Sequence, residues 1–152
     1  MKLAEALQER ADLNRKIEQL RARLMSNCLV QEGEETVESP DELMASLDAA
    51  VSRLEYLVAA INRTNTIARV KDETLTALIA RRDCLTVQLA AYRDLADAAS
   101  QNTRRARGTE IRILPAVDVR AIQKKADGLA RALRETDNAL QAANWTSDLI
   151  EE

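Results

Sequence analysis

Apolar residues recur at intervals of three and four along four long stretches of this chain, and short polar segments separate the stretches. This spacing places the apolar side chains on one side of an α-helix, where they must be buried against other helices. The pattern predicts helices over residues 2–26, 39–66, 74–100 and 118–143. Their apolar positions are Leu13, Ile17, Leu20 and Leu24 in the first, Met44, Leu47, Val51, Leu54, Val58 and Ile61 in the second, Leu75, Leu78, Leu85, Leu89 and Tyr92 in the third, and Val119, Ile122, Ala126, Leu129, Leu133 and Leu140 in the fourth.

The second helix has the clearest start signal and the widest apolar stripe. Ser39 can cap it, Pro40 suits its first turn, and Glu42 completes a capping-box pattern. Besides its main apolar positions it carries Leu43, Ala50 and Leu57. A stripe of this width exceeds what a two-stranded coiled coil uses, so we expect at least two helical neighbours.

Two short segments, residues 28–31 and 110–114, have the composition or the alternation of β-strands. If helix one packs beside helix four, outside a central hairpin of helices two and three, these segments lie at one end and can pair as a ribbon. The expected fold class is therefore all-α: an antiparallel bundle of four long coiled-coil-like helices, with a minor two-stranded β element near residues 28–31 and 110–114. Residues 1–152 are expected to form a single helical-bundle domain. Because an isolated two-stranded ribbon is marginal, we also expect a homo-oligomer.

The amino-acid composition excludes most kinds of catalytic site. The 152 residues include no histidine, which excludes His-based metal sites and catalytic triads. Cys28 and Cys84 are expected to be free thiols, because paired cysteines are typical of secreted chains. We expect no metal and no cofactor. A net charge of −3 gives no general reason to bind nucleic acid or a membrane, and without a signal peptide or transmembrane run the expected location is cytoplasmic.

Polar residues that interrupt the apolar pattern are the candidate site. Asn65 falls where an apolar residue is due at the end of helix two, next to Asn62 and Arg63. Such a residue can fix helix pairing or oligomer state; alternatively, these side chains form a polar pocket that holds an anion. Arg82 and Asp83 in helix three, like Arg10 in helix one, raise the same choice between a structural ion pair and a site, because a buried arginine needs a partner.

Charge is unevenly distributed in the two predicted ribbon segments and around them. Residues 104–125 are mainly basic, whereas the charged residues of 32–42 are all acidic. The patches can neutralise each other, within or between subunits; the alternative, a nucleic-acid surface, lacks interleaved aromatic residues. We take Glu110, Arg112 and Trp145 as candidate ribbon or interface residues, and expect Trp145 to be covered as the C-terminal tail turns back onto the bundle.

Several short segments along the chain form a recognisable series: residues 1–7, 61–65, 81–83, 110–112, Pro115, 117–119 and 144–146. Together they resemble a family of small uncharacterised bacterial helical proteins often labelled septicolysin. The label implies a pore-forming, thiol-sensitive toxin, although this sequence has no amphipathic strand pair long enough to cross a bilayer.

These observations favour a non-enzymatic cytoplasmic scaffold or interaction protein that forms homo-oligomers and works through helical surfaces; the protein partner is unknown. A ligand-binding protein or enzyme with a polar site around Asn62, Arg63 and Arg82 is the first alternative. The toxin implied by the resemblance is the second.

Overall fold

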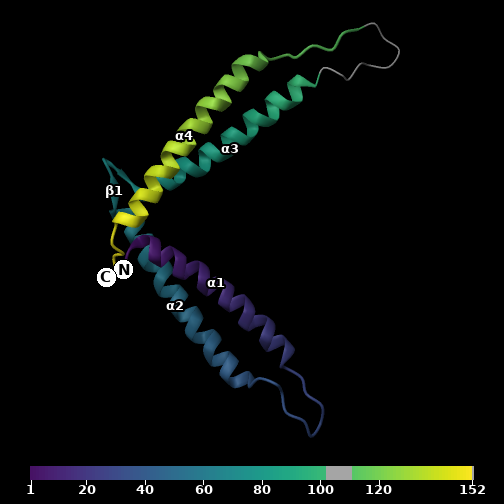
Figure 1. Cartoon of the computed structure of the whole chain (residues 1–152), viewed down its shortest axis with the longest axis vertical. Helices are drawn as coiled ribbons and strands as arrows, with labels where there is room; N and C mark the ends of the chain where they lie inside the picture. Colours follow the sequence, from purple (N-terminus) through teal and green to yellow (C-terminus); the bar gives the residue numbers. More distant parts are fainter. Residues whose placement is uncertain (102–110, 152) are drawn as a thin grey trace. The chain divides into compact units, whose positions relative to one another are not determined.

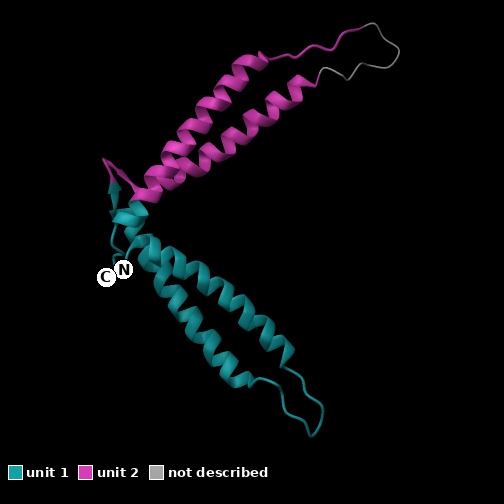
Figure 2. Cartoon of the chain, in the orientation of Figure 1, with its two compact units in different colours: residues 1–69, 143–152 teal, residues 70–142 magenta. Residues whose placement is uncertain are grey.

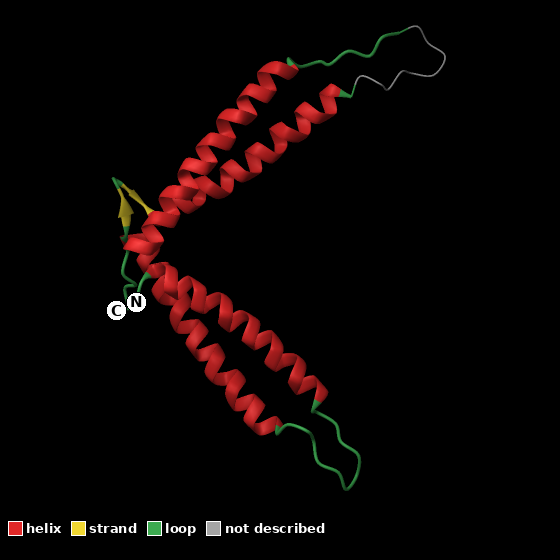
Figure 3. Cartoon of the chain, in the orientation of Figure 1, coloured by secondary structure: helices red, strands yellow, loops and turns green. Residues whose placement is uncertain are grey.

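The computed structural model describes residues 1–101 and 111–151. Figures 1 and 3 show an all-α protein with a small two-stranded sheet, which confirms the expected fold class. In chain order the elements are α1 (Leu3–Ser26), α2 (Pro40–Ile67), β1 (Arg69–Val70), β2 (Glu73–Thr74), α3 (Leu75–Ser100) and α4 (Val119–Thr146).

The chain divides into two compact units, coloured separately in Figure 2. Unit 1 consists of residues 1–69 and 143–152, and unit 2 consists of residues 70–142. Each unit is built on a hairpin of consecutive helices: α1 with α2, and α3 with α4 (Figure 1). The expected arrangement paired helix one with helix four; in the structure α1 instead packs along α2. That residues 1–152 act as one domain stays a prediction.

The helix boundaries follow the capping residues in the sequence. The Ser39 hydroxyl accepts a hydrogen bond from the Glu42 backbone N–H at 3.4 Å, and Pro40 begins α2. Thr74 caps α3 by accepting from the Ala77 N–H at 3.2 Å, and the Asp118 carboxylate accepts from the Ala121 N–H at 3.1 Å. Each cap satisfies a backbone donor that has no partner inside the helix, so all three predicted starts are confirmed.

The two strands lie elsewhere than expected. Among the described residues, 28–31 and 111–114 contain no strand, and Glu110 lies outside the described part. Asn27 instead organises the first loop: its side-chain nitrogen donates to the Arg23 carbonyl at 2.8 Å, and its side-chain oxygen accepts from the Glu38 N–H at 3.0 Å. These bonds join the end of α1 to the residues before α2 without a strand.

The sheet formed by β1 and β2 closes on a two-residue turn, Lys71 and Asp72. Lys71 has a φ of 54°, in the left-handed region that favours glycine and asparagine. Without either residue at this position, the segment lacks the usual sequence signal of a tight hairpin.

The C-terminal tail is bound to the N-terminus within unit 1. The Leu3 N–H donates to the Ser147 carbonyl at 3.0 Å, and the Leu149 N–H donates to the Met1 carbonyl at 2.9 Å. Lys2 and Asp148 form an antiparallel bridge, and their side chains form an ion pair at 2.7 Å. The tail therefore does turn back, as expected, and buries Leu149.

Thr64 connects this tail to the end of α2. Its hydroxyl donates to the Ala60 carbonyl at 2.8 Å and accepts from the Ile150 N–H at 2.9 Å. The side chain is fully buried, with 0% exposure, so neither bond can be replaced by water. We call the contacts among residues 1–3, Thr64 and residues 147–150 the terminal clasp.

We expect Lys71→Gly to stabilise the protein by about 0.5–1 kcal/mol, because glycine adopts a positive φ without a steric penalty. Lys71→Ala, which keeps that penalty, is the matched control and should give no gain. Urea unfolding of both variants measures the difference, and equal effects of the two substitutions would contradict this account.

We expect Thr64→Val to lower the free energy of unfolding by about 1–3 kcal/mol, because valine has the same shape but leaves the Ile150 N–H buried without an acceptor. Hydrogen exchange should show faster exchange at the Ile150 amide. Thr66→Val is the control: it changes an exposed threonine two residues farther along α2 and should leave the Ile150 amide protected.

Candidate interaction surface on the first hairpin

The α1–α2 hairpin has a narrow core. Leu20, Leu43 and Ala50 form a buried cluster between the helices. Four partly buried residues pack around it: Leu13, Ile17, Leu24 and Leu47. Two helices alone share one line of contact, so side chains next to that line remain only partly covered on both flanks.

One flank of the hairpin is polar. Arg53 on α2 donates to both oxygens of Glu9 on α1, at 2.7 and 2.9 Å, and its guanidinium lies 5.3 Å from the centroid of the Tyr56 ring. The hydrogen bond from Arg53 lowers the pKa of the Glu9 carboxyl below its usual value, and the Glu9 carboxylate raises the pKa of Arg53. This ion pair also fixes the register of the antiparallel helices, with Glu9 level with Arg53.

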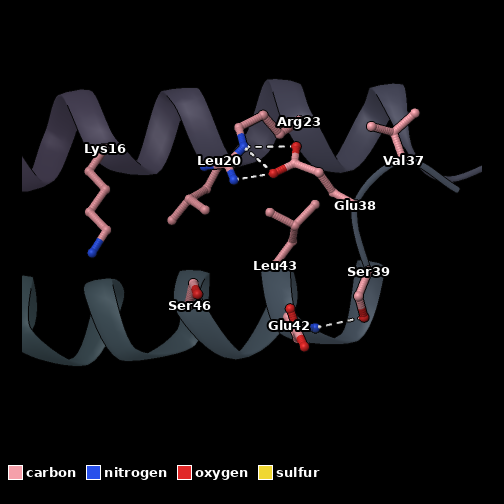
Figure 4. Close-up of a pocket in the computed structure, with 9 residues that line it drawn as sticks. All are labelled: Lys16, Leu20, Arg23, Val37, Glu38, Ser39, Glu42, Leu43 and Ser46. Atoms are coloured by element: carbon pink, nitrogen blue, oxygen red, sulfur yellow. Dashed lines mark hydrogen bonds and ion pairs between the residues drawn. The ribbon is translucent and has the colours of Figure 1, made fainter.

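Farther along the same flank, Figure 4 shows a pocket of about 380 Å³. The Arg23 guanidinium binds the Glu38 carboxylate here, and that hydrogen bond lowers the pKa of Glu38 and raises that of Arg23. Lys16 and Glu42 add opposite charges at the rim. Because acids and bases offset each other, the pocket does not select a ligand of either charge. Its lining residues are Lys16, Leu20, Arg23, Val37, Glu38, Ser39, Glu42, Leu43 and Ser46.

The opposite flank of the hairpin is apolar. Leu47 and Leu54 are half-buried, and beside them Met44, Val51 and Val58 are 46%, 45% and 37% exposed. Residues seven apart lie on the same side of a helix, so these two rows run side by side along α2. We call the surface formed by Leu47, Leu54, Met44, Val51 and Val58, together with Ile17 and Leu24 of α1, the open face.

The open face contains a shallow hollow on α2, with a volume of about 640 Å³. Val51, Leu54 and Val58 form its apolar lining, and Asn62 closes one end. Exposed aliphatic side chains around a hollow are typical of surfaces that bind another protein. Its lining residues are Val51, Leu54, Glu55, Val58, Ala59 and Asn62.

Charged residues of opposite sign adjoin the apolar rows of the open face: Arg10 continues the row on α1, and Asp48 and Glu55 border the rows on α2. Glu18 and Arg21, farther out on α1, form an ion pair with each other at 4.0 Å. Arg10 lies seven residues before Ile17, on the same side of α1, and is half-buried. Asp48 and Glu55 follow Met44 and Val51 by four residues each, on the outer side of α2, and are exposed. Across the part of the chain that the structure describes, no ion pair involves Arg10, Asp48 or Glu55.

The predicted polar residues of α2 lie near the terminal clasp or the hollow. Asn62 is exposed at the end of the hollow. Arg63 is exposed and lies 3.5 Å from the Ile150 carbonyl, to which it donates. Asn65 is half-buried, and Thr64 occupies the fully buried position instead. The buried row of α2 is Leu43, Ala50, Leu57 and Thr64, one residue away from the expected row that ends at Asn65. Leu20 of α1 packs on Leu43 and Ala50 of this row.

The predicted residues of α3 lie in unit 2. Arg82 is half-buried and forms an ion pair with Asp83 at 3.0 Å. Within the same unit, Lys125 of α4 lies 4.6 Å from the centroid of the Tyr92 ring on α3. Whether Asn62, Arg63, Asn65, Arg82 and Asp83 act as a site or in oligomer specification stays a prediction.

The remaining candidates are exposed or lie outside the described residues. Arg112 is exposed in an irregular segment. Trp145 is 64% exposed, so the expectation that the tail covers it is wrong: the tail packs against Met1 and Leu3 instead. Cys28 and Cys84 are free, as expected, and both are exposed. None of the helices in the described part is both long and apolar enough to cross a bilayer.

Sequence reasoning missed two features of the hairpin. Thr64 looked like an ordinary helical residue, although it follows Leu43, Ala50 and Leu57 at intervals of seven, which is the signal that could have identified it. The exposure of Met44, Val51 and Val58 was also missed. The width of the apolar stripe on α2 could have indicated this exposure, since one neighbouring helix covers only part of the stripe.

A family model matches residues 10–149, nearly the whole chain. The chain belongs to the family of unknown function DUF6847. It is similar to a solved structure, described as a functionally unknown conserved protein from Corynebacterium diphtheriae, with 36% sequence identity, 99% of each chain covered and a TM-score of 0.89. Comparison with curated proteins finds no match.

These findings correct the resemblance drawn from the sequence. The segments at residues 1–7, 61–65 and 144–146 belong to a DUF6847 protein, and neither the family nor the structural neighbour has any link to septicolysin. The short motifs that suggested the label carry no information on activity. The toxin alternative loses its basis.

The Glu9–Arg53 ion pair should make the stability of this DUF6847 protein dependent on pH. The pKa of Glu9 is lower in the folded than in the unfolded state, so the pair stabilises the fold above the ordinary pKa of 4.5. That contribution is lost as the pH falls through the lower, folded-state pKa. We expect Glu9→Gln to cost up to about 1 kcal/mol at pH 7, and less as the solution is acidified.

A double-mutant cycle with Glu9→Gln and Arg53→Gln, followed by urea unfolding at pH 7 and pH 2.5, isolates this coupling from other carboxylates. The coupling energy should shrink at the lower pH. A coupling that is zero at pH 7, or that grows in acid, would contradict the role assigned to this pair.

Proposed function

We propose that this DUF6847 protein is a non-enzymatic cytoplasmic scaffold or interaction protein that self-associates through its helices. The observation that carries the proposal is the open face of the α1–α2 hairpin. Met44, Val51 and Val58 lie in one row at about one-half exposure, where a protein core would bury them. Rows of aliphatic residues at heptad spacing bind other helices.

The chemistry of the described residues supports binding over catalysis. The ion pairs on the polar flank are satisfied by each other, as Arg53 is by Glu9 and Arg23 by Glu38. The described part of the chain contains no group of three or more metal-ligating side chains that could hold an ion. The exposed part of the hairpin that still lacks a partner is its apolar surface, and a helix from another protein chain is the element best suited to cover it.

A ligand-binding role around Asn62 and Arg63 has less support. Arg63 is occupied with the Ile150 carbonyl, and Asn62 closes a hollow whose other walls are mainly aliphatic. A hollow of this composition suits a side chain of a partner protein better than a polar small molecule. We therefore assign Asn62 to the interaction surface.

We expect Val51→Asp to abolish self-association of the full chain, because a carboxylate in the centre of the open face would be buried without a partner. The matched control is Val87→Asp on α3, where the side chain is already 72% exposed. Sedimentation equilibrium across a range of protein concentrations measures the mass, and circular dichroism checks that both variants stay helical. A native chain that is monomeric at every concentration, or equal effects of the two substitutions, would contradict the proposal.

A further inference from the structure

We infer that the open face binds the open face of a second copy of this chain, about a two-fold axis parallel to the hairpin, with Arg10 of each copy paired to Glu55 of the other. The inference rests on the proposed self-association and specifies its surface, symmetry and register. It follows from the charges at the two edges of the open face and from the register of α1 against α2.

The occupant is identified by charge. Arg10 borders the face on α1, and Asp48 and Glu55 border it on α2. A partner for this surface must offer an acidic edge to Arg10 and a basic edge to Asp48 and Glu55, with aliphatic residues between them. The same chain offers that surface, because its own open face has these two edges in the required positions.

Symmetry selects one of the possible orientations. A two-fold axis parallel to the helices places α1 of one copy over α2 of the other, so that the basic edge faces the acidic edge. A two-fold axis that lies across the helices places α1 over α1 and α2 over α2. That arrangement brings Asp48 and Glu55 toward their own copies, which is unfavourable. The parallel axis is therefore preferred.

The register then pairs particular residues. Glu9 is level with Arg53 because the two side chains are bonded, and the helices run antiparallel, so Arg10 is level with Ser52, about 4.5 Å along α2 from Glu55. Side chains lean toward the N-terminus of their own helix, so Arg10 and Glu55 lean toward each other, whereas Asp48 leans away. Rotation about an axis parallel to the hairpin leaves this level unchanged. Arg10 of one copy therefore meets Glu55 of the other, and the symmetric pair forms as well. By the same argument Ile17 is level with Ala45 and meets Met44 and Leu47 of the other copy, since α1 and α2 run antiparallel.

The resulting dimer buries the apolar side chains that the single hairpin leaves exposed. Two hairpins packed face to face make a four-helix bundle in which each helix has two helical neighbours, the number that the width of the α2 stripe predicts. Arg10 also gains the carboxylate partner that a half-buried guanidinium requires. Both requirements are met by the same contact.

Charge reversal tests the register. In the full-length protein, Arg10→Glu and Glu55→Arg should each raise the dimer dissociation constant at least 10-fold, because each places like charges together twice per dimer. The double variant with both substitutions should return to within about 3-fold of the native value, since the pair is restored with reversed sign. Arg93→Glu, on an exposed position of α3, is the control and should change the constant less than 3-fold.

Disulfide trapping tests the symmetry independently of affinity. With Cys28 and Cys84 replaced by serine, a mixture of Arg10→Cys chains and Glu55→Cys chains should form a disulfide between the two kinds of chain. Either kind alone should stay uncross-linked. Cross-links within one kind, or equal yield when Arg93→Cys replaces Arg10→Cys, would overturn the parallel two-fold.

The two proposals fail in different ways. A native chain that stays monomeric overturns both. The native chain could self-associate and become monomeric on Val51→Asp, while the double charge variant fails to restore affinity. That result would support the proposed function and overturn the register of the inferred dimer. Rescue together with the mixed disulfide supports the inference.

Discussion

The structure of this protein depends on how little a pair of helices can bury. Two α-helices in contact share one seam, and side chains beside the seam are covered on one side only. In the α1–α2 hairpin that seam holds Leu20, Leu43 and Ala50, while Leu13, Ile17, Leu24 and Leu47 are covered in part. The surface chemistry of the hairpin, an ion-paired flank and an aliphatic flank, is a consequence of this limit. The aliphatic flank is where the hydrophobic effect still has free energy to gain.

The polar flank of the hairpin determines how its two helices align, and the apolar flank provides the surface for binding. On the polar flank, Glu9–Arg53 and Arg23–Glu38 set the register of α1 against α2. Such exposed pairs contribute little to stability, but they exclude slipped alignments of an otherwise repetitive apolar seam. On the other flank, the aliphatic rows contribute area, and the charges at the edges orient whatever binds there.

The sequence was sufficient for the helices but not for their neighbours. Caps are local, so the start of the second helix at Ser39 and that of the fourth at Asp118 were predicted correctly, and of the two caps open for the third helix, Asp72 and Thr74, the structure has Thr74. Helix pairing is not local: periodicity shows that a stripe must be buried, not which helix buries it. Likewise, the α2 stripe spans both Leu43 and Met44, and only the position of α1 decides that Leu43 is buried and Met44 exposed. Asn65 was placed in the core for the same reason, one residue away from Thr64.

The β element shows another limit. Alternation suggested strands near residues 28–31 and 110–114, but the pairing occurs at residues 69–74, around a lysine in a left-handed conformation. The sequence does predict a turn or break over residues 68–73, but without glycine or asparagine at Lys71 it gives no sign that the flanking residues pair as strands. Trp145 was expected to be covered because of its size, yet backbone hydrogen bonds of residues 147–149 determine the path of the tail and leave that ring exposed.

The terminal clasp has a consequence for how the chain is made. Unit 1 combines the first 69 residues with the last ten, and Thr64 bonds to Ile150. During synthesis from the N-terminus, α1 and α2 leave the ribosome long before the segment that completes their unit. The buried hydroxyl of Thr64 and the backbone of Leu3 therefore have no partners until residues 147–150 have been synthesised, so a product that stops before residue 147 lacks the contacts that hold the first helices in place.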